Sequence, residues 1–334
     1  MSQEKLRFIQ LALCSSDLPA SLRFYAEVFG FANGGGQGLW GEIMRVQGLS
    51  PEARAMMWWM VGRQAFCQLE FFHHTQPAQR PLPSDWRPCD IGWTRFGLSV
   101  TDFDRTLERL KDWGVALLAE PRETARGPRA AFRDPWVGAV VEVMGETAAL
   151  PGGIRERNFE LDPAIIYVAS SVSDLDAARF FYGTQLGLEL VPLEVLHDPD
   201  DEAIWGLEGA RRDGFVARAG DAFLEVLQYL QPAARPAAAD SCNADQGIMN
   251  IALGSRNNQA VRDVISRLDA EGRGPRVQFA GEGMLGTYVL DAEREVELFS
   301  GPAENDAALG FAPAGDFIGV PRADRSALTL SFRE

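Results

Sequence analysis

Four glutamates interrupt short apolar runs of this 334-residue chain, at Glu70, Glu142, Glu225 and Glu297. Their spacing is regular, because Glu225 follows Glu70 and Glu297 follows Glu142 by 155 residues (225 − 70 and 297 − 142). A carboxylate in an apolar strand is normally paired with a cation. It can also serve as a general base with a raised pKa, or bind a hard metal ion through oxygen. These four residues are therefore the first candidates for a functional site.

A repeated stretch positions these glutamates in the chain. SDLPASLRFY at residues 16–25 returns as SDLDAARFFY at residues 173–182, and Gly30 returns as Gly187, in each case 157 residues later. Each copy follows an apolar run and predicts a strand, then a helix capped by Asp and ended by Gly. Self-similarity at a fixed separation indicates that the fold arose by duplication.

Each half contains a second, weaker copy of this pattern, a strand-like run followed by a helix-capping residue. Residues 96–101 precede Asp102, and residues 248–253 precede Asn257. Short apolar runs follow every one of the four predicted helices. The pattern predicts four βαβββ modules, at about residues 6–75, 90–146, 163–232 and 246–302. We expect an N-terminal domain, a linker, a C-terminal domain and a tail at residues 1–147, 148–162, 163–303 and 304–334.

Composition excludes several classes of function. The net charge is −15 (32 − 47) and the pI near 4.8, so we expect no nucleic-acid partner. No apolar run is long enough for a membrane span, and the first residues do not read as a signal peptide, so we expect a cytoplasmic protein. The cysteines form no Cys-x-x-Cys pair, which argues against a disulfide framework or a zinc ribbon.

The sequence resembles the vicinal oxygen chelate superfamily, which includes glyoxalase I, bleomycin-resistance proteins and extradiol dioxygenases. The resemblance rests on the two repeated stretches, on the turn Asp134-Pro135 to Gly138 before Glu142, and on the four-module layout. It implies an α+β fold whose modules pair into two glyoxalase/dioxygenase-like domains. Each domain would be a curved mixed sheet that forms a cup.

The resemblance also implies where site residues lie. Family ligands stand on the first strand, seven residues before the capping residue, and on the last strand, at the glutamate. The first cup would then hold Gln10, Glu70, Arg95 and Glu142. The second cup would hold Tyr167, Glu225, Asn250 and Glu297.

A divalent metal (Fe, Mn, Ni or Zn) is one implied cofactor, held by Gln10, Glu70 and Glu142 or by Glu225 and Glu297. The family's histidines are missing, however, and Arg95 cannot be a ligand because a guanidinium has no acceptor. Glu70 and Glu142 could instead form a buried ion pair with Arg95, or one of them could be a general base. Tyr167 could donate to a substrate oxyanion, or could simply be an inward-facing aromatic residue.

Other residues complete the prediction. Trp58, Met60 and His74 are expected to line the substrate pocket, whereas His197 is expected in a solvated acidic loop. We predict an enzyme of lyase or isomerase type that acts on a small apolar or aromatic oxygenated metabolite. Glu70 or Glu142 would be the base, and Arg95 or Gln10 would hold the substrate oxygen. The alternatives are a metal-dependent dioxygenase or glyoxalase, and a non-catalytic binding protein of the bleomycin-resistance kind. A homodimer is expected from the resemblance.

Overall fold

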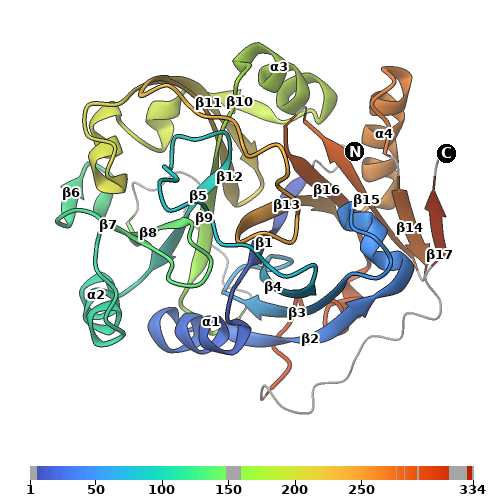
Figure 1. The fold of residues 1–334 in the computed structure, drawn as a ribbon, viewed down its shortest axis with the longest axis horizontal. Coiled ribbons are helices and arrows are strands. Elements are labelled where there is room, and N and C mark those ends of the chain that lie inside the picture. Colours follow the sequence, from blue (N-terminus) through green and yellow to red (C-terminus); the bar gives the residue numbers. More distant parts are fainter. Residues whose placement is uncertain are drawn as a thin grey trace.

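The computed structural model describes residues 6–147, 159–275, 277–281, 283–291, 293–315 and 329–332. Two large curved sheets lie side by side in it, with α1 and α2 at the bottom and α3 and α4 at the top of the view (Figure 1). The predicted linker and tail fall partly outside these residues, so the proposed domain boundaries stay a prediction.

The first half contains two modules of a strand, a helix and three strands, as predicted. The first consists of β1 (Arg7–Cys14), α1 (Leu18–Phe24), β2 (Ala32–Trp40), β3 (Arg54–Val61) and β4 (Gln68–Gln76). The second consists of β5 (Gly92–Val100), α2 (Phe103–Asp112), β6 (Arg122–Thr124), β7 (Gly127–Arg133) and β8 (Val140–Gly145).

The second half repeats this order. Its first module consists of β9 (Ala164–Ser171), α3 (Leu175–Arg179), β10 (Glu189–Val191), β11 (Arg211–Ala219) and β12 (Ala222–Gln231). The last consists of β13 (Gly247–Ser255), α4 (Asn258–Ala270), β14 (Val277–Gly281), β15 (Met284–Leu290) and β16 (Glu295–Ser300), and β17 (Thr329–Phe332) follows it. The α+β fold of four βαβββ modules is confirmed.

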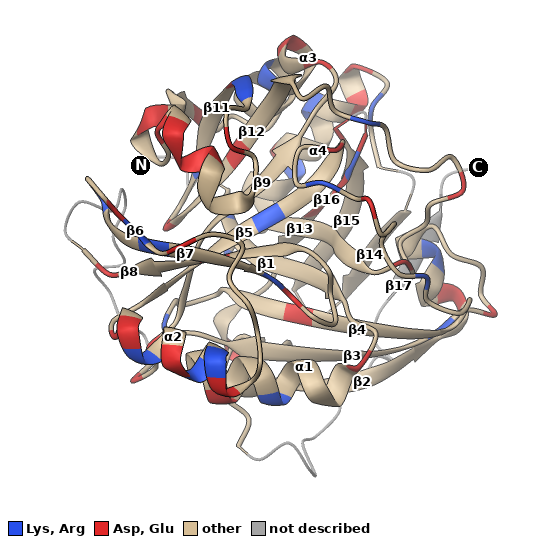
Figure 2. Ribbon diagram, turned by 60° about the vertical axis from the view of Figure 1, so that its left-hand side comes forward, with Lys and Arg blue, Asp and Glu red and all other residues tan. Residues whose placement is uncertain are grey.

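The predicted caps begin the helices. The side chains of Asp17, Asp102, Asp174 and Asn257 each accept a hydrogen bond from a backbone N–H of the first turn, at 2.9–3.1 Å. Gly30 ends the first helical stretch with φ +86°, the left-handed conformation that favours glycine. Figure 2 shows charged residues on α2, whose other face packs inward through residues such as Phe103 and Leu110.

Each sheet combines a module of the first half with one of the second. The nine-stranded sheet has the order β17-β14-β15-β16-β13-β1-β4-β3-β2, and the eight-stranded sheet has the order β10-β11-β12-β9-β5-β8-β7-β6. At the centre of each, two modules meet through antiparallel first strands, β1 with β13 and β5 with β9. Module one therefore shares a sheet with module four, and module two with module three.

The helices follow a different pairing. The Tyr25 hydroxyl, at the end of the first helix, donates to Asp134 in the turn before β8, at 2.9 Å. In the second half, Tyr182 donates to Asp291 at 3.0 Å in the same way. The tyrosines of the repeated stretch thus tie modules one and two together, and modules three and four, outside the sheets. Among the described residues, no helix is long and apolar enough to cross a membrane.

Candidate active site

The sheet pairing changes which predicted residues meet. Gln10, Glu70, Asn250 and Glu297 all belong to the nine-stranded sheet, whose concave face we call the nine-strand cup. Arg95, Glu142, Tyr167 and Glu225 belong to the eight-stranded sheet and its eight-strand cup. The prediction that each half of the chain builds its own cup is therefore wrong. All four modules carry equivalent positions, so the positions alone do not reveal which modules pair.

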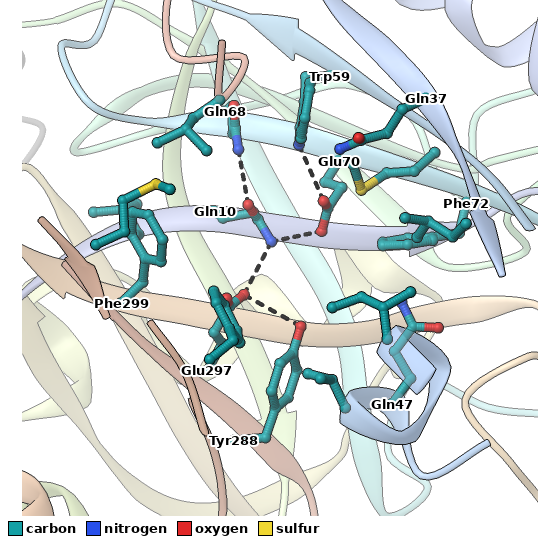
Figure 3. A pocket seen from close by; sticks show the side chains of 18 of the residues that line it. Gln10, Gln37, Gln47, Trp59, Gln68, Glu70, Phe72, Tyr288, Glu297 and Phe299 are labelled. Carbon is teal, nitrogen blue, oxygen red and sulfur yellow. Dashed lines mark hydrogen bonds between the residues drawn. The ribbon is translucent and has the colours of Figure 1, made fainter. Parts of the chain in front are cut away.

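At the floor of the nine-strand cup, Gln10 joins two carboxylates. Its Nε2 lies 2.6 Å from Glu70 Oε2 and 3.3 Å from Glu297 Oε2 (Figure 3). Residues in register beside the two glutamates, Ala12 and Ala252, are small. The cavity floor is therefore formed by two acids and one amide.

Neighbouring strands supply the groups that orient these carboxylates. Trp59, opposite Glu70 on β3, donates its Nε1–H to Glu70 Oε1 at 3.0 Å. Tyr288, opposite Glu297 on β15, donates its hydroxyl to Glu297 Oε2 at 3.4 Å. Sequence reasoning missed both residues, although cross-strand pairing with each glutamate is a usable signal.

Apolar side chains surround this polar floor. The cavity extends from β3 and β4 to the opposite strands and to residues beyond β16, and its wall includes Met57, Trp59, Phe72, Phe279, Phe299 and Phe311. A concave, mostly aromatic wall above a few convergent polar groups is typical of a small-molecule site.

Burial sets the charge of one acid. Burial raises the pKa of Glu297 to about 7, while hydrogen bonds from Tyr288 and Gln10 act in the opposite direction and Glu295 raises it further. Near neutral pH this carboxyl therefore exists in both forms and can accept or release a proton.

Trp58, Met60 and His74, which were expected to line the substrate pocket, do not line this cavity, so that prediction is wrong. Trp58 donates to Asn33 at 2.7 Å, and Met60 lies in the main core between the helices and the sheet. His74 is buried beside Gln47, 3.2 Å away, and burial lowers its pKa to about 4. Strand β3 presents Met57 and Trp59 to the cavity instead. Side chains alternate along a strand, and a run of Met and Trp does not tell which alternate set faces inward.

The nine-strand cup as arranged does not fit a divalent metal. The atom that stands between Glu70 and Glu297 is the Gln10 Nε2, which donates hydrogen bonds and has no lone pair for a metal ion. Asn250, at the fourth position, is fully buried and does not line the cavity. Its amide lies beside Tyr288 and makes no hydrogen bond of good geometry. The described residues contain no group of three His, Cys, Asp or Glu side chains that could hold a metal ion.

The eight-strand cup is filled by its own ion pairs. Arg95 binds Glu225 at 2.7 Å, and Arg129 binds Glu142 at 2.9 Å, all four side chains being fully buried. The predicted pairing of Arg95 with Glu70 or Glu142 is therefore wrong, because Arg95 lies in the other sheet from Glu70 and faces Glu225. Glu142 has a pKa lowered to about 2, since His197 and Arg129 outweigh the opposing effect of its burial.

His197 closes this cup. It follows the 3₁₀ helix Leu193–Val195 and is fully buried, with Nδ1 at 2.8 Å from Glu225 and Nε2 at 3.2 Å from Glu142. Burial would lower its pKa, but the two carboxylates raise it above the ordinary value. The expectation of a solvated His197 is wrong, because its ring lies between two buried carboxylates and the acidic run beside it forms a short 3₁₀ helix that buries Asp201 and Glu202.

Tyr167 and Trp205 fill the remaining space. Both donate to Glu142 Oε2, at 2.5 and 3.1 Å, and Trp205 stacks on the guanidinium of Arg95 with 3.7 Å between them. Tyr167 is therefore hydrogen-bonded to a protein carboxylate and is not open to a substrate. The nine-strand cup is the better candidate active site.

Comparison with known proteins agrees with this architecture. Residues 7–143 match the family model Glyoxalase/Bleomycin resistance protein/Dioxygenase superfamily. Glyoxalase I from Zea mays is similar in structure, with a TM-score of 0.57, 14% identity, and coverage of 92% of this chain and 96% of that chain. A Bacillus subtilis protein described as a dioxygenase has a TM-score of 0.59, 14% identity, and coverage of 92% and 91%. No curated protein sequence matches.

At such identities the solved structures establish the fold alone. The similarity to these structures covers about nine-tenths of the chain. It therefore includes both the first half, which the family model matches, and the repeated modules of the second half. Residues 7–143 thus match the Glyoxalase/Bleomycin resistance protein/Dioxygenase superfamily, and about nine-tenths of the chain shares the fold of these solved structures.

Proposed function

We propose that this protein is an enzyme that moves a proton on a small apolar or aromatic carbonyl compound bound in the nine-strand cup. The observation that carries the proposal is the carboxylate pair, Glu70 and Glu297, held by Gln10 at the floor of an aromatic-walled cavity. The chemistry is of lyase or isomerase type.

Glu297 is the proposed acid and base. Its ionised form would take a proton from the carbon next to the substrate carbonyl, and the electron pair would move to the carbonyl oxygen. The Tyr288 hydroxyl lies 3.4 Å from Glu297 and could donate to that oxygen. Return of the proton from Glu297 to a neighbouring carbon would give the isomer. Glu70, fixed by Trp59, would orient Gln10 and so the substrate.

The substrate class follows from the wall of the cavity. Aromatic side chains such as Phe72 and Phe299 favour flat or apolar groups, and Gln10, Glu70 and Glu297 offer hydrogen-bonding groups at the floor. A carbonyl or hydroxyl at one end of an apolar body fits both features.

The test is deuterium exchange in D₂O at the carbon beside the carbonyl, over a panel of aromatic carbonyl compounds. We expect the wild type to catalyse exchange of at least one compound and Glu297→Gln to lose it by about 100-fold or more. The control is Glu108→Gln, on the exposed face of α2 and outside the cavity wall, which should leave the exchange unchanged. Retention of full exchange by Glu297→Gln would remove Glu297 from the mechanism.

The second candidate is a protein that binds a small molecule without catalysis. The hydrogen bonds of Gln10 with Glu70 and Glu297 favour it, because they already satisfy the polar groups of the floor without a reacting substrate. It predicts ligand uptake with no exchange in any variant. The metal-dependent alternative is tested by elemental analysis of the purified protein, where we expect well under one metal ion per chain. One ion per chain that is lost in Glu70→Ala would contradict the proposed metal-free chemistry.

A further inference from the structure

Four glutamine side chains of the described residues border the cavity of the nine-strand cup, at Gln10, Gln37, Gln47 and Gln68. Three of them are bound to protein groups. Gln10 donates to the two carboxylates of the floor, Gln68 lies 2.8 Å from Gln10, and Gln47 Oε1 lies 3.2 Å from His74 Nε2. Gln37 differs from them, because its amide has no hydrogen-bond partner among the residues that the structure describes.

The Gln37 side chain is buried in the protein but faces the cavity. The residue is only 5% exposed, and Figure 3 shows its amide end turned toward the part of the cavity where Glu70 lies. A buried amide that makes no hydrogen bond with the protein is costly. A ligand in the cavity can supply the missing partner, so this position indicates a binding contact.

Glycines of the same strand hold Gln37 in this orientation. Residues 34–38 are Gly-Gly-Gly-Gln-Gly and form the middle of β2. The ring of Trp58 on β3 packs so closely on Gly36 that an added Cβ would lie 2.3 Å from it, and Trp58 Nε1 donates to Asn33 at 2.7 Å. This indole supports β2 from the face away from the cavity. Because side chains alternate along a strand, Gln37 projects from the opposite face, into the cavity.

Strand register sets the interval between Gln37 and the acidic floor. Gln37 lies opposite Met57 on β3. Glu70 lies opposite Trp59, two residues further along the same strand, so Gln37 and Glu70 belong to one face of the sheet. They are two strands and two positions apart, which corresponds to about 12 Å between their Cα atoms. Since both side chains extend into the cavity, a ligand built on one aromatic ring can contact both.

The amide of Gln37 determines which kind of ligand group fits beside it. An amide is uncharged and offers N–H donors as well as an oxygen acceptor. A hydroxyl group can donate to that oxygen or accept from the N–H. A carboxylate only accepts, and it would share the cavity with the acidic side chains of Glu70 and Glu297. An apolar group would leave the buried amide unpaired.

We propose that Gln37 is a specificity-determining residue that binds an uncharged hydroxyl group on the ligand, across an aromatic ring from the carbonyl. The ligand class is thereby narrowed to hydroxylated aromatic carbonyl compounds. Contacts at both ends of the ring fix its place along the apolar wall and orient the carbon beside the carbonyl toward Glu297. This deepens the proposed function and rests on it for the choice of cavity and for the carbonyl at the floor.

The experiment is calorimetric titration of wild type and Gln37→Met with para-hydroxyacetophenone, para-methylacetophenone and para-acetylbenzoate. We expect the wild type to bind the hydroxyl probe about tenfold more tightly than the methyl probe, because the methyl group leaves the buried amide unpaired. The carboxylate probe should bind most weakly. In Gln37→Met, which has a side chain of similar size without the amide, the affinities for the two neutral probes should agree within about twofold.

Leu39→Met is the matched control, because Leu39 is the next residue of β2 that lines the same wall. It should change the affinities for both neutral probes by the same factor and so keep their ratio. Gln37→Met should unfold at a temperature no lower than the wild type, since the amide has no protein partner to lose. A loss of thermal stability would assign Gln37 a structural role and overturn the proposal.

Three binding results would also overturn it. These are an unchanged preference in Gln37→Met, a wild type that prefers the methyl or carboxylate probe, and a wild type that binds none of the three. Binding does not need turnover, so the two proposals can fail separately. A preference for the hydroxyl probe that depends on Gln37, without deuterium exchange, would refute only the proposed function. Exchange that does not depend on Gln37, with no preference among the probes, would refute only this inference.

Discussion

Identical residue types at matched positions have different fates in the two cups. Glu142 and Glu225 are neutralised by arginines and His197, whereas Glu70 and Glu297 face a cavity and share an amide. The difference arises from neighbours contributed by distant parts of the chain. A carboxylate acquires a functional pKa from its surroundings and not from its place in a repeat.

Glu297 should make the stability of the protein depend on pH. Its pKa in the folded protein is about 7, above the ordinary 4.5, so the folded state binds more protons between these values. Its contribution is then greatest below pH 4.5 and is lost as the pH rises to 7. Relative to wild type, Glu297→Gln should gain up to about 3 kcal/mol in the free energy of unfolding between pH 4.5 and 8. Urea denaturation at pH 5 and pH 8 measures this.

Glu108→Gln, on the exposed face of α2, is the matched control and should show no such pH-dependent gain. Equal curves for wild type and Glu297→Gln at both pH values would mean that Glu297 is ionised as an ordinary carboxyl in the folded protein.

His197 should contribute to stability and not to ligand binding. Its removal in His197→Ala leaves two buried carboxylates without the group between them, which typically costs about 3 kcal/mol of unfolding free energy. Because its pKa is raised, this contribution is present below about pH 6.5 and is lost as the pH rises through the folded value. Chemical denaturation and ligand titration of the same variant would separate the two roles, and a large loss of affinity at retained stability would contradict this assignment.

At the scale of elements, two features define the cavity. Strand β3 presents one alternate set of its Met and Trp side chains, and residues 303–315, which we call the strap, add Leu309 and Phe311 from beyond β16. The 3₁₀ helix Gly41–Gln47 contributes Val46 and Gln47 to the wall. The equivalent region of the third module instead places His197 and Trp205 inside its cup. The connection between the second and third strands of a module, β2–β3 or β10–β11, therefore distinguishes the open cup from the filled one.

The strap can be tested through its glycines. Gly310→Ala places a methyl against Trp59 in a left-handed conformation, so we expect the strap to be displaced and the affinity for an aromatic probe to fall about tenfold. Gly315→Ala has the same strained φ, +79°, but meets nothing within 4 Å, and it controls for backbone strain alone. Tryptophan fluorescence and probe titration measure both, and equal effects would mean that the Trp59 contact is unimportant.

At the scale of the whole molecule, each sheet joins the two halves of the chain. Strands β1 and β13 pair in one sheet and β5 and β9 in the other, while the tyrosines of the repeats bind modules within a half. Both cups are thus completed within one chain, and the expected homodimer would not be needed to form either.

A cut between the halves should leave the molecule assembled. A protease site introduced between residues 148 and 158, then cleaved, should give two fragments that co-elute in gel filtration and keep ligand affinity, because the central strand pairs cross between them. The fragments should separate only in denaturant. Fragments that separate in native buffer would contradict the paired sheets.

The sequence alone was sufficient for the modules, their caps and the α+β class. These depend on local signals, namely strand runs, Asp or Asn caps and glycine stops, which every copy of the repeat carries. Gln10, Glu70, Asn250 and Glu297 were likewise placed on the correct strands. The repeat period makes such positions visible, since each residue is compared with its counterparts along the same chain.

Only the tertiary structure decided how these positions combine. Four equivalent modules can pair in more than one way with the same local pattern, so the grouping of Glu70 with Glu297 and of Arg95 with Glu225 depends on which first strands meet. The packing of Gly310 on Trp59 and the burial of His197 between Glu142 and Glu225 arise from contacts between residues far apart in the chain. Such contacts depend on packing in three dimensions, which neither periodicity nor residue spacing records.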